Sequence, residues 1–218
     1  MLTITKGAIA VLLGALAVAG DNELSKEEAA AGFKLLFDGK TLDGWKVAQK
    51  PEAFAAENGT LACNGKGGGW IYFEKEEFGD FELRMDFKVS AGANSGLFFR
   101  VGDPKDEVYT GIEMQILDSA AAAKPGVHDC GAIYDLVAPR ENAMKAAGEW
   151  NTVKLVCRGP KIEVEMNGKP ITSMNLDEWT VPKGKFPTAY AKMPRKGFIG
   201  MQDHGNPVWF RNIRIRPL

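Results

Sequence analysis

The chain has 218 residues, of which 45% are hydrophobic and 25% charged, a balance that suits one globular domain with a substantial core. The formal net charge of −1 gives no indication of binding to nucleic acid or to an anionic membrane surface. The 25 glycines and 11 prolines, set among many short alternating runs, favour turns and β-structure.

The first 19 residues have the pattern of a secretory signal peptide. Lys6 precedes an apolar run over 8–19 that ends with the small residues Ala17 and Ala19. A charged start, an apolar segment and an Ala-x-Ala end are typical of a cleaved signal. The alternative, a retained membrane anchor, is disfavoured because the run is short for crossing a bilayer. We therefore predict that residues 1–19 direct export and that the mature protein is not held in a membrane.

A short helical lead-in is predicted over residues 20–32, before a single domain over 33–218. Ser25 is placed to cap the helix, Glu28 to complete a capping box, and Gly32 to end it. The domain has no internal repeat. Its strands are short and no long helix interrupts them, so the sequence predicts an all-β sandwich of two antiparallel sheets.

Several local motifs support this arrangement. Apolar and charged residues alternate over 81–89, which is typical of a half-buried strand. The Asn-Gly pairs at 58–59 and 167–168 predict hairpin turns, and Asn94-Ser95 is expected to form a turn. The glycine-rich stretch 65–69 is interpreted as a flexible rim loop, since no Lys-Ser/Thr pair or helix follows it as in a phosphate-binding loop.

The three cysteines are Cys63, Cys130 and Cys157. In an oxidising compartment one pair could form a disulfide, with three possible pairings and one thiol left over. Cys157 alternates with Val153 and Leu155, which favours a small buried hydrophobic residue at that position. The chain contains no Cys-x-x-Cys motif and no Cys/His spacing typical of a structural metal site.

Polar side chains on two predicted strands, 94–100 and 112–118, mark the candidate site. Glu113 and Gln115 are two residues apart in a strand, so they share one face, with about 6.6 Å between them. Asp118 stands at the end of that strand, and Arg100 closes the other strand. An acid, an amide and an arginine on one sheet face can bind hydroxyl-rich ligands, and the acid can move protons.

With these segments in view, the chain resembles a known family over roughly residues 32–218, with its motifs in the same order. The resemblance rests on these stretches: Leu36-Phe37-Asp38-Gly39, Leu42-Asp43-Gly44-Trp45, Gly79-Asp80-Phe81-Glu82-Leu83, Asn94-Ser95-Gly96, Ile112-Glu113-Met114-Gln115-Ile116-Leu117-Asp118, Gly131-Ala132-Ile133-Tyr134, Gly148-Glu149-Trp150-Asn151, Gly200-Met201-Gln202-Asp203-His204-Gly205 and Phe210-Arg211-Asn212-Ile213. The family is that of the 3-keto-disaccharide hydrolases, long catalogued as a domain of unknown function.

The resemblance implies a concanavalin/LamG-like jelly roll whose concave sheet carries the site. It also implies an exported bacterial protein, periplasmic or secreted, that acts on small glycosides oxidised at C3. The implied activity is that of a 3-keto-glycoside 1,2-lyase, a 3-keto-2-hydroxy-glucal hydratase, or both. A ketone at C3 acidifies the proton on C2, so a base can remove it and the group on C1 can then leave.

Such a reaction needs a base near C2, a stabiliser for the C3 oxyanion and an acid for the leaving oxygen. From residue chemistry we predict Glu113 or His204 as the base. Asp118 or His128 is predicted to assist the leaving group on C1. The predicted substrate-binding residues are Arg100, Gln115, Tyr134, Gln202 and Asp203. No cofactor is required by this scheme, but a divalent cation could replace the arginine at the oxyanion, with Glu113, His128 and His204 as its ligands.

Two other functions fit parts of the pattern. Glu113-x-Gln115-x-x-Asp118 is similar to the acid-x-Asp-x-x-acid motif of bacterial β-glucanases, although the middle acid is here an amide, so a retaining glycosidase is one alternative. A non-catalytic carbohydrate-binding domain is the other, because lectins use the same fold. Glu113 and Asp118 could equally be paired with Arg100, and Trp45, Trp70, Tyr134 and Trp209 could pack in the core or stack on a sugar.

Overall fold

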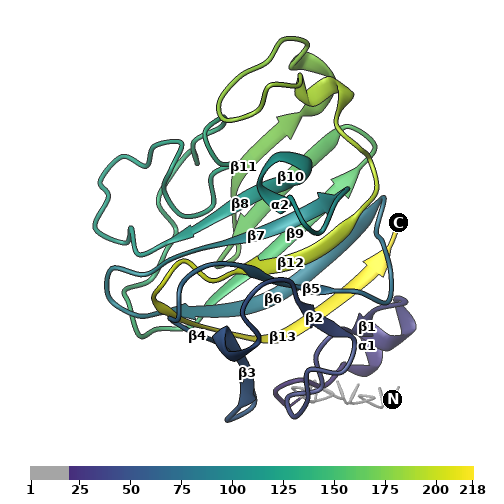
Figure 1. Ribbon diagram of the computed structural model, residues 1–218, viewed down its shortest axis with the longest axis vertical. Coiled ribbons are helices and arrows are strands. Elements are labelled where there is room, and N and C mark those ends of the chain that lie inside the picture. The colour runs from purple at the N-terminus through teal and green to yellow at the C-terminus, as the bar shows by residue number, and fades with distance from the viewer. Residues whose placement is uncertain (1–19) are drawn as a thin grey trace, which may run out of the picture.

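The computed structural model describes residues 20–218, and the predicted signal peptide lies outside the described residues. Figure 1 shows two layers of strands packed face to face. One sheet has eight strands in the order β11-β10-β9-β6-β13-β4-β3, with β1 paired to β13, and the other has five in the order β2-β5-β12-β7-β8. All strand pairs are antiparallel. The predicted two-sheet jelly-roll sandwich is therefore confirmed.

The strands are β1 (Lys34–Leu35), β2 (Trp45–Val47), β3 (Phe54–Glu57), β4 (Thr60–Asn64), β5 (Trp70–Phe73), β6 (Phe81–Val89), β7 (Asn94–Val101), β8 (Ile112–Leu117), β9 (Asn151–Arg158), β10 (Lys161–Met166), β11 (Lys169–Asn175), β12 (Phe198–Gln202) and β13 (Pro207–Pro217). The helices are short: α1 (Lys26–Ala30), α2 (Glu107–Thr110), η1 (Pro51–Ala53), η2 (Leu176–Glu178) and η3 (Tyr190–Lys192). Within residues 20–218, no helix combines the length and the apolar character needed to span a membrane.

The local predictions are confirmed at one helix cap and two hairpin turns. Ser25 caps α1 by accepting the Glu28 N–H at 3.1 Å, and the Glu28 carboxylate accepts the Ser25 N–H in return. The Asn-Gly pairs at 58–59 and 167–168 join β3 to β4 and β10 to β11, with Asn58 and Asn167 both at positive φ. Asparagine and glycine tolerate that conformation, which a tight hairpin requires.

The core lies between the sheets and takes one face of each strand. Along β6, Phe81, Leu83, Met85, Phe87 and Val89 are all buried, which confirms the predicted half-buried strand. All three cysteines are buried and free of disulfides. Burial raises the pKa of the Cys157 thiol to about 12, as expected for a side chain that serves as a small hydrophobe.

A separate apolar cluster covers part of the other face of the five-stranded sheet. It consists of Trp70, Tyr72, Phe98 and Val101 and is distinct from the main core, which takes Leu97 and Phe99 from the same strand. Trp70 stacks on Tyr72 at 4.9 Å between ring centroids and donates from its indole N–H to the Pro104 carbonyl at 2.9 Å. Aromatic rings therefore cover part of this outer face.

Candidate active site

Strand register places the candidate site on the outer face of the five-stranded sheet. Glu113 on β8 is paired directly with Phe98 on β7, and Phe98 is paired with Gly200 on β12. Gly200 is paired in turn with Tyr72 on β5. Directly paired residues in an antiparallel sheet share a face, so Glu113 stands beside the Trp70–Phe98 cluster and points away from the core.

Glycine at position 96 makes room for the Glu113 carboxylate. A Cβ at Gly96 would lie 3.0 Å from the Glu113 Cγ and closer still to the carboxylate oxygen Oε1. The φ of Gly96 is not in the left-handed region, so space, and not backbone conformation, is what requires glycine here. The Glu113 carboxylate thus lies over β7, in the space that a side chain at position 96 would fill.

Lys185 meets this carboxylate from a different part of the chain. Its ammonium Nζ lies 2.7 Å from Glu113 Oε2, and the two side chains are only 17% and 5% exposed. Lys185 belongs to the loop that joins β11 to β12 at one end of the sandwich (Figure 1). That loop is held by Arg195, which donates to Asp177 at 2.7 Å and to the Ala191 carbonyl at 3.1 Å.

Three aromatic rings surround the lysine. Its Nζ lies 4.8 Å from the ring centroid of Tyr134, 5.3 Å from Phe98 and 5.5 Å from Phe186. Phe186 is fixed by an edge-to-face contact with Tyr190 at 4.7 Å between centroids. The ring faces attract the cation and exclude water from one side of the ion pair. The ion pair is therefore partly shielded from solvent, and electrostatic interactions there are stronger than in water.

Burial changes the acid strength of two carboxyl groups near this lysine. Burial raises the pKa of Glu113 above its ordinary value of 4.5, while the charges of Lys185 and His204 limit the rise. Burial also raises the pKa of Glu107, at the start of α2, and Lys185 and Glu113 both contribute to the field at that group. Raised carboxyl pKa values beside a cation are characteristic of acid–base sites.

Gln115 lies two residues from Glu113 on the same face. Its Nε2 donates to Asn94 Oδ1 at 3.0 Å, while its buried Oε1 has no hydrogen-bond partner within the described chain. Asn94 starts β7, so the predicted turn at 94–95 is wrong and its amide instead belongs to the site. A buried acceptor without a donor is costly unless a ligand or water satisfies it. The Gln115 carbonyl oxygen is almost completely covered in this structure, so a ligand hydroxyl can pair with it only after a small shift of the side chain.

Gln202 ends β12, and the turn that follows carries Asp203 and His204. Asp203 is buried, and its two oxygens accept the N–H groups of Gly67 at 3.1 Å and Gly205 at 2.9 Å. The glycine-rich stretch 65–69, predicted to be a flexible rim loop, is hydrogen-bonded to this turn. His204 is exposed, and a positive charge on it would lower the pKa of Glu113. Gln202 is paired with Trp70 and shares its face of the sheet.

His128 and Tyr134 lie together at the rim. The rings are 4.9 Å apart between centroids, and His128 Nε2 is 3.1 Å from Asp135 Oδ1. Tyr134 is half-buried and contacts Lys185, whereas the His128 side chain is 59% exposed. Tyr134 therefore lies between His128 and the Glu113–Lys185 pair. His128 itself is at the exposed edge of the site.

Arg100 lies outside the site, contrary to its predicted role. Its side chain is fully buried and donates to the carbonyls of Gly79 at 3.1 Å and Gly159 at 2.8 Å, and to Asp80 at 3.1 Å. The reason is a β-bulge, because Phe198–Gly200 on β12 faces Phe98–Val101 on β7 and Arg100 takes a φ of +52°. The extra residue breaks the alternation that would have put Arg100 on the face of Phe98.

Asp118 is also separated from Glu113. It follows the end of β8, five residues beyond Glu113, which corresponds to about 17 Å along an extended strand. Its Oδ2 accepts the Gly92 N–H at 2.8 Å, so it fixes the turn before β7. The structure thus brings Glu113 and Tyr134 against Lys185, keeps Gln115 on the same sheet face and His204 within electrostatic range of Glu113, and leaves Arg100 and Asp118 elsewhere.

The predicted metal ligands do not form a metal site. Among residues 20–218, no three His, Cys, Asp or Glu side chains are grouped to hold an ion. Glu113 is engaged with Lys185, whose positive charge occupies the position that a cation would take beside that carboxylate. With an ammonium already paired to Glu113 and amides as the neighbouring polar groups of the sheet face, the arrangement does not suit a divalent cation.

Sequence patterns gave no signal for Lys185 or Glu107. Lys185 stands in an irregular loop, 72 residues from its partner, and Glu107 in a four-residue helix between β7 and β8. Neither segment has a strand or helix periodicity from which a face could be assigned. Only the folded chain shows that Lys185 contacts Glu113 and that Glu107 lies within electrostatic range of both.

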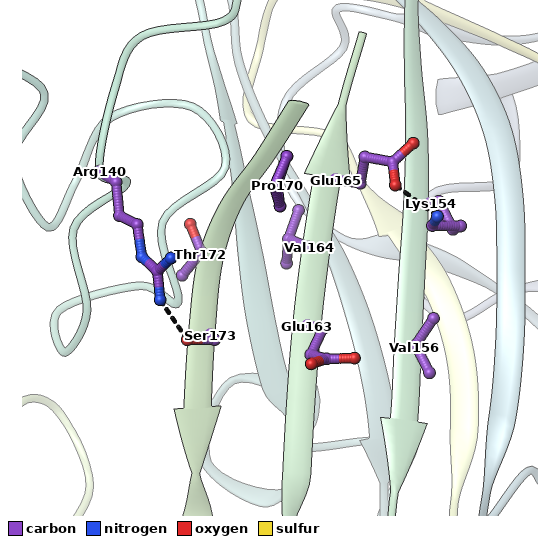
Figure 2. Close-up of a pocket in the computed structure, with 9 residues that line it drawn as sticks. All are labelled: Arg140, Lys154, Val156, Glu163, Val164, Glu165, Pro170, Thr172 and Ser173. Carbon is purple, nitrogen blue, oxygen red and sulfur yellow. Dashed lines mark hydrogen bonds and ion pairs between the residues drawn. The ribbon is translucent and has the colours of Figure 1, made fainter. Parts of the chain in front are cut away.

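A depression of about 290 Å³ on the other sheet provides a comparison. Figure 2 shows it over β9, β10 and β11, where Glu165 pairs with Lys154 and Arg140 donates to Ser173 at 3.2 Å. These charges and hydroxyls are exposed or half-exposed and satisfy one another. The depression lacks a buried group of altered acidity, so the candidate active site is the Glu113–Lys185 face.

Comparison with known proteins places the chain in a family. Residues 32–216 match the family described as the 3-keto-alpha-glucoside-1,2-lyase-like domain. A protein of Bacteroides thetaiotaomicron named 3-keto-disaccharide hydrolase is 32% identical over 232 aligned residues, covering 87% of this chain and 79% of that protein. A crystal structure of a candidate glycosyl hydrolase from Parabacteroides distasonis is 35% identical, with a TM-score of 0.76, and covers 85% of this chain and 99% of its own.

A more distant structure shows the fold alone. The carbohydrate-binding module CBM66 from Bacillus subtilis superimposes with a TM-score of 0.53 at 12% identity, covering 79% of this chain and 95% of the module. This likeness agrees with the two antiparallel sheets described above and carries no statement about the site.

Proposed function

Since the chain belongs to the 3-keto-alpha-glucoside-1,2-lyase-like family, we propose that it cleaves 3-keto-glycosides with Glu113 as the base. One observation carries this assignment: a buried carboxylate of raised pKa stands on the outer sheet face beside a buried ammonium. A carboxylate so placed is a better base than a solvated one, because its pKa is closer to neutrality. The relatives named for 3-keto-sugar and glycoside cleavage support the same substrate class.

The proposed reaction is an elimination. Glu113 takes the proton from C2, the electron pair of that C–H bond forms the C2–C3 double bond, and the ketone oxygen becomes an enolate oxygen. The enolate then reforms the ketone as a C1–C2 double bond forms and the C1–O bond breaks. The leaving oxygen receives the proton held by Glu113, which regenerates the carboxylate. Addition of water to the product would complete a net hydrolysis.

Neighbouring groups have supporting roles in this proposal. Gln115 Oε1, a buried acceptor that has no partner among the described residues, binds a sugar hydroxyl. Tyr134 and Gln202 border the same face, and His204 and His128 contribute from the rim. Asp203 acts indirectly, since it fixes the turn that carries His204.

The retaining-glycosidase alternative has weaker support. It needs two carboxyl groups about 5 to 5.5 Å apart, and the pair suggested by the sequence, Glu113 and Asp118, is separated by about 17 Å along the strand. The binding-module alternative rests on the fold, which catalytic and non-catalytic proteins share. Export through residues 1–19 remains part of the proposal and is supported by the sequence pattern alone.

The assay that tests the function supplies 3-keto-glucosides and unoxidised glucosides to the purified protein in parallel. We expect turnover of the oxidised substrate only, and a loss of about 10²- to 10⁴-fold in kcat for Glu113→Gln. Cleavage of unoxidised glucosides would support the glycosidase instead. Binding of either sugar without turnover would support the module.

A further inference from the structure

We infer that Lys185 is the catalytic residue that stabilises the enolate oxygen, an assignment that rests on the function proposed above. The carboxylate and the ammonium lie 2.7 Å apart, so a substrate that presents its C2 hydrogen to Glu113 presents its C3 oxygen, on the adjacent carbon, to Lys185. The C2 hydrogen and the C3 oxygen of the substrate are close together, as are the Glu113 carboxylate and the Lys185 ammonium that would contact them.

The ammonium has donors to spare. A lysine carries three N–H donors, and Nζ of Lys185 makes one hydrogen bond within residues 20–218, to Glu113 Oε2. The rings of Tyr134, Phe98 and Phe186 attract the charge without accepting a strong hydrogen bond, and 17% of the lysine side chain remains exposed to a ligand. A ligand oxygen can therefore join the ammonium without displacing Glu113.

Charge movement in the reaction favours this arrangement. In the resting state the negative charge is on Glu113, and after proton transfer it is on the C3 oxygen. Lys185 contacts the Glu113 carboxylate and can also reach the C3 oxygen. The cation therefore stays beside the negative charge throughout, and the loop need not rearrange. Preorganised stabilisation of this kind is most effective where aromatic side chains exclude water.

The loop has the contacts needed to hold the lysine in place. Phe186, the next residue, is buried and packs edge-to-face on Tyr190 and on Tyr109. Lys183, two residues earlier, is exposed, with its Nζ 4.7 Å from the Trp179 ring centroid and away from Glu113. The two lysines share one loop but have different surroundings, so Lys183 provides a matched control.

The test compares Lys185→Met with Lys183→Met on a 3-keto-glucoside, measuring kcat, KM and the rate at which the C2 hydrogen exchanges with deuterated water. For Lys185→Met we expect kcat and C2 exchange to fall together by about 10²- to 10³-fold, with KM changed by less than about threefold. The acid limb of its pH profile should also move to higher pH, because the charge that limits the pKa of Glu113 is gone. Lys183→Met should behave as the wild type.

A Lys185→Met kcat within about threefold of wild type would overturn the inference, as would a rise in KM at unchanged kcat, since either points to loop anchoring alone. If Lys185→Met does not fold, Lys185→Arg is measured instead. A folded, active Lys185→Arg supports a role for the positive charge. A folded Lys185→Arg that is as slow as Glu113→Gln overturns the inference. Failure of the proposed function is distinguishable, because the wild type itself would then leave 3-keto-glucosides intact.

Discussion

The Lys185 ammonium lies 2.7 Å from the Glu113 carboxylate, although the two residues are 72 positions apart in the sequence. One comes from a regular strand of the five-stranded sheet and the other from an irregular loop. Breaking a buried pair of this kind by removing one partner leaves an uncompensated charge and is costly. The pair therefore fixes the loop over the sheet and provides the groups that the proposed elimination requires.

The pH dependence of kcat/KM should show the ionisation of Glu113. The carboxylate must be ionised to accept the C2 proton, and burial raises its pKa above 4.5. As pH falls through that raised value the group becomes protonated and the rate declines, so the acid limb should lie above pH 4.5. A profile measured with a 3-keto-glucoside checks this. A limb at or below 4.5 would mean that another group is the base.

Substitution of Gly96 by alanine should displace the base without disturbing the fold. The new Cβ would lie 3.0 Å from the Glu113 Cγ, so the carboxylate must shift. A displacement of about 1 Å at a reacting group costs on the order of 10²-fold in rate. Thermal melting and kcat should be measured beside Gly126→Ala, an exposed glycine whose added Cβ meets only ordinary contacts. Equal, wild-type rates for both variants would contradict the proposed position of the base.

Gln115→Met should separate stability from binding. The change removes a buried acceptor that has no partner within residues 20–218, which favours stability, and also the hydrogen bond from Nε2 to Asn94 Oδ1, which opposes it, so the melting temperature should change little. The same acceptor is proposed to bind a substrate hydroxyl, and its loss should raise KM by about tenfold, or about 1.4 kcal/mol. An unchanged KM would show that the Gln115 carbonyl does not face the sugar.

Arg100→Met should act on stability and not on catalysis. The guanidinium is buried and satisfies two backbone carbonyls and Asp80, so its removal should cost about 3 kcal/mol in the free energy of unfolding. The exposed Arg158→Met should change that free energy by less than about 0.5 kcal/mol. Urea denaturation measures both. A stable Arg100→Met protein with a large loss of kcat/KM would restore the predicted binding role.

Local sequence rules predicted the parts of the fold that depend on neighbouring residues. The capping box of Ser25 and Glu28, the Asn-Gly hairpins and the alternation along β6 are of this kind. The shared face of Glu113 and Gln115 followed from the same period of two, and both are buried on one face of β8.

The remaining features depend on contacts between distant segments. The bulge that turns Arg100 inward arises from the register of β7 against β12, which strand alternation cannot show. Lys185 reaches Glu113 because the long loop after β11 folds back over the sheet, and an irregular loop has no period to follow. Pairing between segments so far apart is set by the whole fold.

The most direct measurement of the central claim is the kinetic isotope effect on kcat/KM for a 3-keto-glucoside carrying deuterium at C2. If Glu113 removes the C2 proton in the step that governs cleavage, the deuterated substrate reacts more slowly, and deuterium appears in water as the glycosidic bond breaks. A substrate cleaved at the same rate with its C2 label fully retained would contradict the elimination and favour direct displacement at C1.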